Sequence, residues 1–214
     1  MRKYVRISLA LVIIEIIIAA IVFPFLPEQI PIHWNNSGVV DGYGSKWMIF
    51  FLPGISAAVI GLLLVLPVID PLGKNIMRSV KAYGIVILST VTLIAVLFVA
   101  TLMTVFEVPV SVEKVTPVAV GIMFIVIGNY LPKTKRSFTF GIRFPWTVLN
   151  DDVWAKTHRV GAWAFMANGL LFIAGAFMPP PMNYIVPISG LFIFLIGIGI
   201  YSFFEYRKVS DIIK

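Results

Sequence analysis

The residues that could do acid–base or metal chemistry are few in this 214-residue chain. The two histidines, His33 and His158, lie far apart in the sequence, and there is no cysteine, which excludes thiol catalysis and Cys-ligated zinc. Glu28 and Asp41 lie near His33, and the three could form a weak metal or proton site, although such groups in one polar loop are more often solvated. No P-loop, nucleophile elbow or dinucleotide motif is present. We therefore predict a protein without enzymatic activity, cofactor or resident metal.

A further candidate for chemistry is Glu15, which interrupts an otherwise apolar stretch. A charged side chain costs about 3 kcal/mol or more at the centre of a membrane-spanning helix, so Glu15 should face other helices or be protonated. One interpretation is a proton- or ion-coupling site. The other is a neutral carboxyl group hydrogen-bonded to Ser89, Thr90 or Thr92 of another apolar stretch.

The elements that must position these residues are predicted to be membrane-spanning helices. The chain is 59% apolar and 13% charged, against about 25% charged in soluble domains, and about 20 apolar residues span a bilayer. The predicted spans are Ile7–Phe25, Met48–Ile69, Ala82–Phe106, Val115–Leu131, Val160–Met178 and Tyr184–Phe204. Prolines 179–181 divide the last two, because proline ends a helix. Asn129 and Asn168 are predicted to form hydrogen bonds between helices, and Gly121 and Gly128 a close-packed face.

Positive charge gives the predicted topology. Fifteen of the 17 Lys and Arg residues lie in four segments, Arg2–Arg6, Lys74–Lys81, Lys133–Arg159 and Arg207–Lys214. Cytoplasmic loops carry the excess of Lys and Arg. The predicted fold is therefore an all-α integral membrane protein with six transmembrane helices and both termini cytoplasmic. Charge clustered at the ends of spans favours contact with anionic lipid headgroups over direct nucleic-acid binding.

The predicted extracellular loop, residues 27–47, has more structure than a simple connector needs. Ile30–Trp34 is predicted to be extended, residues 35–38 to form a turn, and Asp41-Gly42 to form another turn. The aromatic side chains of this loop suit the lipid headgroup level. The candidate contact residues here are His33, Trp34 and Asp41.

The predicted cytoplasmic loop, residues 133–159, contains six Lys and Arg residues. Large apolar side chains alternate strictly from Phe138 to Trp146, which in an extended chain places the rings on one face and Arg143 on the other. Arg143 could bind a lipid phosphate or a partner carboxylate through its guanidinium group. Alternatively, it could pair with Asp151 or Asp152 and fix the loop.

A helix is predicted to follow within the same loop and to continue into the fifth span. Asn150 is its expected N-cap, and Asp152 and Lys156 form a favourable i,i+4 pair on it. The candidate partner- or lipid-binding residues of the whole loop are Lys133, Lys135, Arg136, Arg143, Pro145, Trp146, His158 and Arg159.

Two regions resemble a known family and its usual neighbour. Residues 128–135 (GNYLPKTK), 140–143 (FGIR), 145–147 (PWT), 153–154 (VW) and 157–159 (THR) resemble the SdpI family of polytopic immunity and signalling proteins. Residues 30–34 (IPIHW), with Gly38, Asp41-Gly42 and Lys46, resemble the N-terminal module of unassigned function that often precedes it. Ser137 and Phe144 depart from the family pattern, which has Asn and a small polar residue there.

The resemblance implies a multi-pass plasma-membrane protein with a two-helix module at 1–81 and an SdpI-like four-helix module at 82–214. In the best-understood members, such a protein protects the cell against a secreted peptide toxin and binds a small transcriptional repressor at its cytoplasmic face. The expected partners are therefore membrane lipids, a peptide toxin outside and a repressor inside. The alternative is a small ion- or proton-coupled transporter or channel that uses Glu15, which Glu15→Gln would inactivate.

Overall fold

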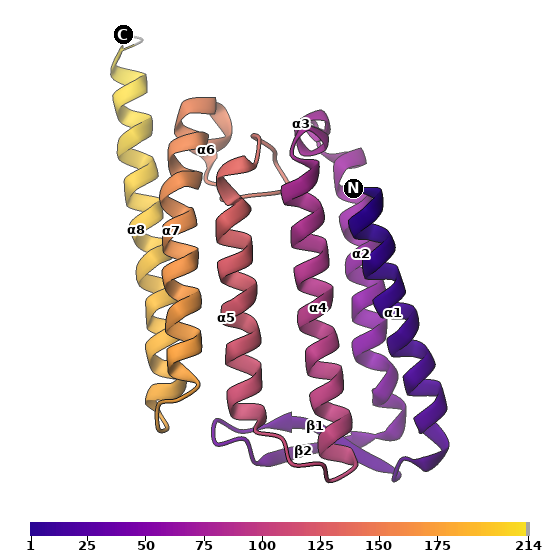
Figure 1. Cartoon of the computed structure of the whole chain (residues 1–214). Helices are drawn as coiled ribbons and strands as arrows, with labels where there is room; N and C mark the ends of the chain where they lie inside the picture. The colour runs from indigo at the N-terminus through magenta and orange to yellow at the C-terminus, as the bar shows by residue number, and fades with distance from the viewer. Residues whose placement is uncertain (213–214) are drawn as a thin grey trace.

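Six long helices run side by side within residues 1–212, the part of the chain that the computed structural model describes (Figure 1). They are α1 (Arg2–Val22), α2 (Phe51–Ile69), α4 (Val80–Val105), α5 (Val112–Tyr130), α7 (Asp151–Gly175) and α8 (Met182–Ile212). The shorter elements are α3 (Gly73–Arg78), α6 (Pro145–Leu149), the strands β1 (Gln29–Trp34) and β2 (Val40–Ser45), and the 3₁₀ turns η1 (Phe23–Phe25), η2 (Lys46–Phe50) and η3 (Leu131–Lys133).

Five of the long helices have the length and apolar composition needed to cross a bilayer. They are α1, α2, α4, α5 and α8, some of them extended by a 3₁₀ turn. Helix α7 is different because its first turns carry charged side chains, which leaves residues 160–175 as its uncharged part. The protein is thus an all-α membrane protein in its composition and architecture. The prolines at 179–181 separate α7 from α8, as predicted.

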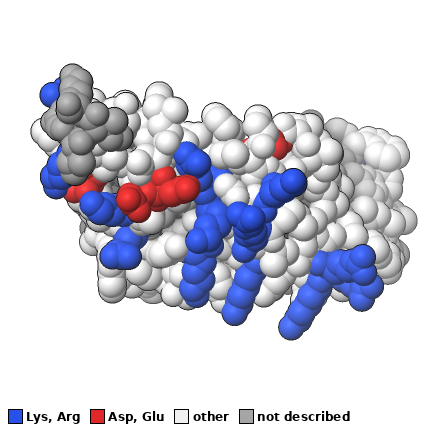
Figure 2. All heavy atoms as spheres, turned by 90° about the horizontal axis from the view of Figure 1, so that it is seen from above, with Lys and Arg blue, Asp and Glu red and all other residues white. Residues whose placement is uncertain are grey.

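The two ends of the helix bundle differ in charge. Figure 1 places the N-terminus, α3, α6 and the last turns of α8 at one end, and the β1–β2 hairpin at the other. Figure 2 looks down on the first end and shows Lys and Arg side chains gathered there. The first three basic segments of the sequence and the described part of the fourth lie at that end. We call it the basic face and the opposite end the hairpin face.

Helices α1, α2 and α4 form the larger hydrophobic core together with the hairpin. Near the basic face, Val12, Ile60 and Ile87 are buried in one cluster. Near the hairpin face, Phe98 is buried with Ile30 of β1 in a second cluster. The hairpin is therefore held to the helices by apolar packing and not only by its own hydrogen bonds.

Helices α5 and α7 pack closely through the glycines that the sequence marked. A Cβ atom on Gly121 would lie 2.5 Å from the carbonyl oxygen of Gly169, and one on Gly128 would lie 2.9 Å from that of Ala162. Only glycine allows the two backbones to approach this closely. The predicted close-packed face is confirmed.

The hairpin follows the prediction in its first strand and turn. Strand β1 pairs antiparallel with β2, and the side chain of Asn35 accepts hydrogen bonds from the Ser37 and Val39 N–H groups at 2.9 and 3.1 Å. Gly38 closes the turn with φ +75°, which favours glycine. The predicted second turn at Asp41-Gly42 is wrong, because both residues lie within β2, where Gly42 pairs with His33 of β1.

Candidate functional site

The loop between η3 and α6 at the basic face, residues 134–144, is folded back on itself and is not an extended segment; we call it the motif loop. Residues 138–142 form bends, and α6 follows directly, so the strand predicted from the alternating apolar residues is wrong. The ring of Phe140 packs edge-on against that of Tyr83, with the ring centroids 4.9 Å apart, whereas Phe138 is 52% exposed. The aromatic rings of the loop therefore do not share one face. Side chains from other elements bind the loop's backbone N–H groups, which removes the need for a partner strand.

Asp70, directly after α2, is the main anchor of this loop. One carboxylate oxygen of Asp70 accepts hydrogen bonds from the N–H groups of Phe138 and Thr139, at 2.9 and 2.8 Å, and from the Thr139 hydroxyl at 2.6 Å. The other oxygen accepts from the Leu72 N–H at 2.7 Å. Burial acts to raise the pKa of Asp70, but the hydrogen bonds from Thr139, Leu72 and Phe138 together lower it below its usual value. Asp70 therefore stays ionised and ties α2 to the motif loop.

Two further contacts join the loop to the elements around α3. The side chain of Asn75 donates to the Arg136 carbonyl oxygen at 3.0 Å, and the Ser79 hydroxyl accepts from the Lys135 N–H at 2.7 Å. Ser137, fully buried, accepts from the Phe140 N–H at 3.0 Å and closes a tight turn. The loop is thus fixed from both ends.

His158 holds the other side of the loop from α7. Its Nδ1 lies 2.8 Å from the Trp154 carbonyl oxygen, and its Nε2 accepts a hydrogen bond from the Ile142 N–H at 2.9 Å. The ring stacks on Trp154 with centroids 4.0 Å apart. Because Nε2 accepts, the proton of the neutral ring is on Nδ1. Burial lowers the pKa of His158 to about 4, so His158 is a neutral structural residue at pH 7.

Acid is therefore expected to destabilise the fold through His158. The folded pKa is depressed from 6.5 to about 4, so the stabilisation is complete above pH 6.5 and is lost as pH falls toward 4. This amounts to about 2 kcal/mol of unfolding free energy at pH 5. Equilibrium unfolding of the purified protein in detergent micelles at pH 7 and pH 5 measures it. His158→Gln should remove this pH dependence, and an unchanged pH dependence in that variant would contradict the assignment.

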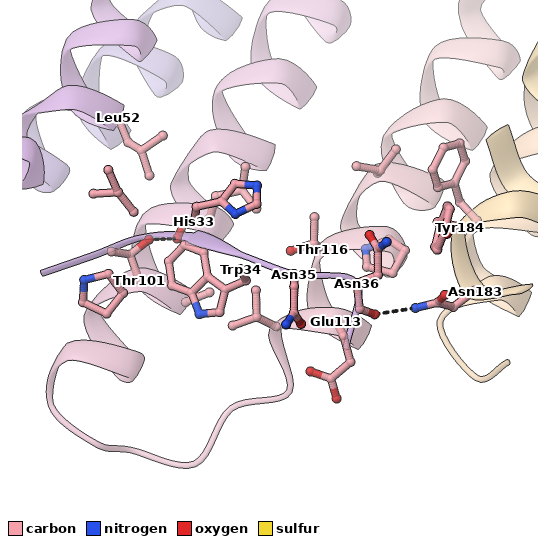
Figure 3. Close-up of a pocket in the computed structure, with 18 of the residues that line it drawn as sticks. His33, Trp34, Asn35, Asn36, Leu52, Thr101, Glu113, Thr116, Asn183 and Tyr184 are labelled. Carbon is pink, nitrogen blue, oxygen red and sulfur yellow. Dashed lines mark hydrogen bonds between the residues drawn. The ribbon is translucent and has the colours of Figure 1, made fainter. Parts of the chain in front are cut away.

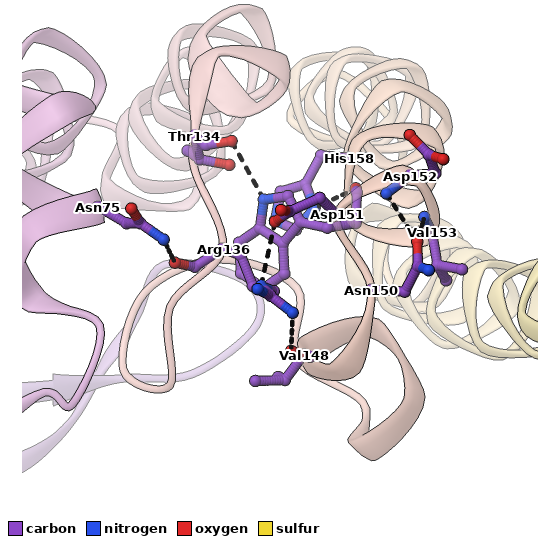
Figure 4. A network of polar contacts seen from close by, with 10 residues as sticks. Asn75, Thr134, Arg136, Val148, Asn150, Asp151, Asp152, Val153 and His158 are labelled. Atoms are coloured by element: carbon purple, nitrogen blue, oxygen red, sulfur yellow. Dashed lines mark hydrogen bonds and ion pairs between the residues drawn. The ribbon is translucent and has the colours of Figure 1, made fainter.

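Arg136 is the centre of the polar network in Figure 4. Its Nη1 donates to the Val148 carbonyl oxygen at 3.1 Å, and its Nε lies 3.0 Å from Asp151 Oδ1. The Nε–H does not point at that oxygen, so the contact is ionic and not a hydrogen bond. Asn150 caps α7 as predicted, because its side chain accepts from the N–H groups of Asp152 and Val153.

Arg143 makes one contact and is otherwise open to solvent. Its Nη1 donates to the Phe138 carbonyl oxygen at 2.9 Å. The predicted alternative pairing with Asp151 or Asp152 is wrong, because Arg136 is the partner of Asp151. Between positions 133 and 159 the other exposed basic residues are Lys133, Lys135, Arg159 and Lys156, of which Lys156 is paired with Glu205 of α8. The loop therefore exposes cationic side chains on a backbone that hydrogen bonds from other elements hold in place.

Trp146 and Lys156 connect this region to α8. The Trp146 Nε1 donates to the Ser202 hydroxyl at 2.9 Å, and the Trp146 ring stacks on that of Phe144 with the ring centroids 5.3 Å apart. Pro145 begins α6, where a missing N–H costs nothing. Lys156 pairs with Glu205 at 2.7 Å, so the predicted Asp152–Lys156 pair is wrong. These contacts give Trp146 a structural role.

The ionisable side chains of the hairpin form two separate pairs. His33 Nδ1 lies 2.5 Å from Asp41 Oδ1, whereas Glu28 pairs with Lys46 at 2.8 Å. The three-residue site considered for His33, Glu28 and Asp41 is therefore not assembled. Among residues 1–210, whose side chains are described, no group of three or more His, Asp and Glu side chains is placed to hold a metal ion.

A cavity of about 690 Å³ lies at the hairpin face, between the hairpin and the helices above it (Figure 3). Its walls come from α2, α4, α5, α7 and α8, and residues 30–36 of β1 and the hairpin turn form part of its lining, including His33 and Trp34. The volume is within the range of about 300–1,000 Å³ that is typical of ligand pockets. This cavity could not be predicted from the sequence, because its lining comes from segments that are distant in the chain.

The intramembrane polar residues do not make the predicted contacts. Glu15 is buried, but its neighbour is Ser56 of α2 and not the Ser and Thr residues of α4. Neither oxygen of Glu15 has a hydrogen-bond partner of good geometry in the part of the chain that the structure describes. Asn168 is buried without a hydrogen-bond partner among the described residues, and Asn129 is exposed. The predicted hydrogen bonds between helices are therefore wrong for Asn168, and Asn129 points away from the core.

Comparisons with known proteins match two separate regions of the chain and, more weakly, nearly its whole length. Residues 133–204 match the family model described as the SdpI/YfhL protein family. Residues 10–57 match a domain of unknown function, DUF1648. The chain is also 22% identical over 210 residues to the immunity protein SdpI of Bacillus subtilis (strain 168), a similarity that covers 98% of this chain and 99% of that protein. No solved structure matches the chain.

Each matched region contains one of the two structured loops described above. The SdpI/YfhL region contains the motif loop, α6, α7 and most of α8, and the DUF1648 region contains most of α1, the hairpin and the start of α2. The resemblance predicted from the motifs is thus confirmed by a separate match in each region. The chain thus matches the SdpI/YfhL family model in one region and DUF1648 in the region before it, and it is similar to an SdpI immunity protein over nearly its whole length.

Proposed function

We propose that this protein is a non-enzymatic immunity protein of the plasma membrane that protects the cell against a membrane-active peptide toxin. The observation that carries the proposal is the similarity to an SdpI immunity protein over 98% of the chain. In this proposal all six long helices span the membrane, and the basic face, with both termini, is cytoplasmic. The hairpin face then meets the toxin on the outside.

Two features of the hairpin face support this role. The cavity combines apolar walls from the spanning helices with polar residues of the hairpin, so an amphipathic molecule at the outer membrane surface could reach it. Trp47 and Tyr43 are 66% and 60% exposed at the same face. Exposed Trp and Tyr side chains settle at lipid headgroup level, where a membrane-active peptide also accumulates.

At the basic face, we propose that the motif loop captures a cytoplasmic regulator. Lys133, Lys135, Arg143 and Arg159 are exposed there, and the loop is held by Asp70 and His158. A fixed backbone reduces the entropy lost when a partner binds, which favours a specific contact over a diffuse attraction. Anionic lipid headgroups are the expected second partner of the same cationic side chains.

Expression of the full chain in toxin-sensitive bacteria tests the proposed protection. The cells are challenged with a purified membrane-permeabilising peptide secreted by bacteria, and the membrane potential is followed with a voltage-sensitive dye. Cells that contain the protein should keep their potential at toxin concentrations that depolarise cells with an empty vector. Equal depolarisation at confirmed membrane abundance, across the secreted peptides tested, would contradict protection.

Arg143→Ala is expected to weaken capture of the regulator severalfold without lowering the amount of protein in the membrane. The reason is that Arg143 is exposed and donates only one hydrogen bond to the loop, so its removal costs little stability. Its guanidinium group can bind a carboxylate or phosphate through two nitrogens. Co-purification of cytoplasmic proteins with the full chain, together with immunoblots of membranes, measures both quantities. Arg136→Ala is the contrasting variant, because Arg136 is built into the network and its loss should lower membrane abundance. A fall in abundance for Arg143→Ala as well would indicate that Arg143 is structural.

A further inference from the structure

We propose that the cavity at the hairpin face binds a peptide segment with a free ammonium group next to apolar side chains, and that Glu113 is the counter-ion of that ammonium. This inference rests on the proposed function and specifies the kind of ligand that the hairpin face would recognise.

The inner part of the cavity is apolar. Leu52 of α2, Leu97 of α4, Val120 of α5, Phe172 of α7 and Ile188 of α8 line it, so five different helices contribute apolar side chains. A surface of this kind gains free energy by taking apolar groups from water, at about 25 cal/mol per Å². The volume of about 690 Å³ admits several apolar side chains and is far too small for a folded domain.

The mouth of the cavity carries negative charge and hydrogen-bond acceptors. Glu113 is half-buried there and is the one carboxylate among the described residues that line the cavity, which include no lysine and no arginine. One of its oxygens lies beside Gly38 in the hairpin turn. No ion pair is formed by Glu113 within residues 1–210, where side chains are described, since the ion pairs there involve other residues.

Asn183, at the start of α8, adds an unused acceptor to this mouth. Its Nδ2 donates to the Asn36 carbonyl oxygen at 2.8 Å, which joins the hairpin turn to α8 (Figure 3). Its Oδ1 is buried and has no hydrogen-bond partner in the described part of the chain. A buried acceptor without a donor is destabilising, so a ligand that brings a donor is favoured.

An ammonium group fits this set of partners because it has three N–H donors and no acceptor. The carboxylate of Glu113 would repel a ligand that ends in a carboxylate or phosphate. A phosphatidylethanolamine headgroup also has an ammonium, but its phosphate lies close by and finds no cationic side chain in the cavity lining. A peptide with an amino terminus or lysine beside apolar residues satisfies the apolar walls and the acidic mouth together.

Fluorescence anisotropy with the full chain in phosphatidylcholine nanodiscs tests the proposal. The probe is the pentapeptide Leu-Ala-Phe-Ala-Leu with a fluorophore at its C-terminus, compared with the same peptide acetylated at its N-terminus. The free amine is expected to bind about tenfold more tightly than the acetylated peptide, because hydrogen bonds to charged groups are the stronger ones. Equal affinity of the two peptides would overturn the role of the ammonium.

Three variants locate the interaction. Glu113→Gln should remove the preference for the free amine, whereas Glu107→Gln, a change of the same chemistry in the exposed α4–α5 connection outside the cavity, should keep it. Leu97→Trp should weaken binding of both peptides by filling the apolar part. Retention of the preference in Glu113→Gln, or unchanged binding in Leu97→Trp, would overturn the site. Unchanged elution and helical content of each variant show that it is folded.

Lipid competition and the cell assay separate the remaining possibilities. Displacement of the peptide when phosphatidylethanolamine is added to the nanodiscs would show that a lipid is the occupant and would overturn the proposal. Protection of cells without binding of either peptide would overturn the cavity assignment and leave the proposed function standing. Peptide binding of the expected pattern without protection would support the site and contradict the immunity function.

Discussion

Gly141→Ala is expected to lower the unfolding free energy by about 4 kcal/mol, the largest effect of any single change that we predict. Gly141 has φ +113°, a backbone conformation that side chains with a Cβ rarely adopt. An added Cβ would also lie 2.5 Å from His158 Nε2 and 2.7 Å from Trp154 Cζ2. Neither ring can move away, because His158 binds the Ile142 N–H and Trp154 donates to the Thr134 carbonyl oxygen at 3.1 Å.

The measurement for Gly141→Ala is equilibrium unfolding in mixed detergent micelles, with membrane abundance as a second readout. Gly197→Ala is the matched control, because a Cβ at Gly197 in α8 meets nothing within 4 Å. That control should change the unfolding free energy by less than about 1 kcal/mol, and toward stability, since alanine favours helix. If both variants behaved alike, the strained contact at Gly141 would not be the cause.

Asp70→Ala is expected to cost about 3 kcal/mol of unfolding free energy and to loosen the motif loop. The change removes the acceptor for the N–H groups of Phe138 and Thr139 and for the Thr139 hydroxyl. These three donors are part-buried and are left without that acceptor. Loosening should appear as faster hydrogen exchange of these two amides. Asp152→Asn is the control, because Asp152 is exposed and its change should cost less than about 1 kcal/mol.

The stabilising effect of Asp70 should also depend on pH. Its folded pKa lies below the ordinary value of 3.8, so the ionised form is favoured by folding. The stabilisation is therefore fully present above about pH 5 and is lost as pH falls below 4 toward the folded pKa. Asp70→Asn should unfold with a weaker pH dependence than the wild type in this range. A parallel pH dependence for both proteins would contradict the role of the Asp70 carboxylate.

The sequence predicted the helices well because their signals are local. Apolar length and charge at the ends are enough to place α2, α4 and α5 within about three residues, whereas α1 begins at Arg2, before the predicted Ile7, and α8 continues to Ile212, beyond the predicted Phe204. The N-cap at Asn150, the close-packed glycines and the first strand of the hairpin were also predicted from short-range rules. The resemblance to the SdpI family depended on residues that fix the motif loop, which explains why a short pattern was informative.

The site residues were harder to predict, because their partners are distant in the chain. The alternation from Phe138 to Trp146 indicated a strand, but Asp70 and His158 supply hydrogen bonds that stabilise a bent loop instead. Asp70 was missed because a lone carboxylate after an apolar stretch resembles an ordinary helix end. One signal was present: Asp70 is the one acidic residue between Glu15 and Glu107 that lies at the basic face.

The hairpin turn and α8 touch through Asn36 and Asn183, and α2 touches the motif loop through Asp70 at the far end of the same bundle. Polar contacts between distant segments therefore hold the bundle together at both of its ends. A ligand bound in the cavity between these two contacts cannot separate the helices. Binding must instead rearrange the side chains that line the cavity, so the tilts of the helices should be the same with and without a ligand.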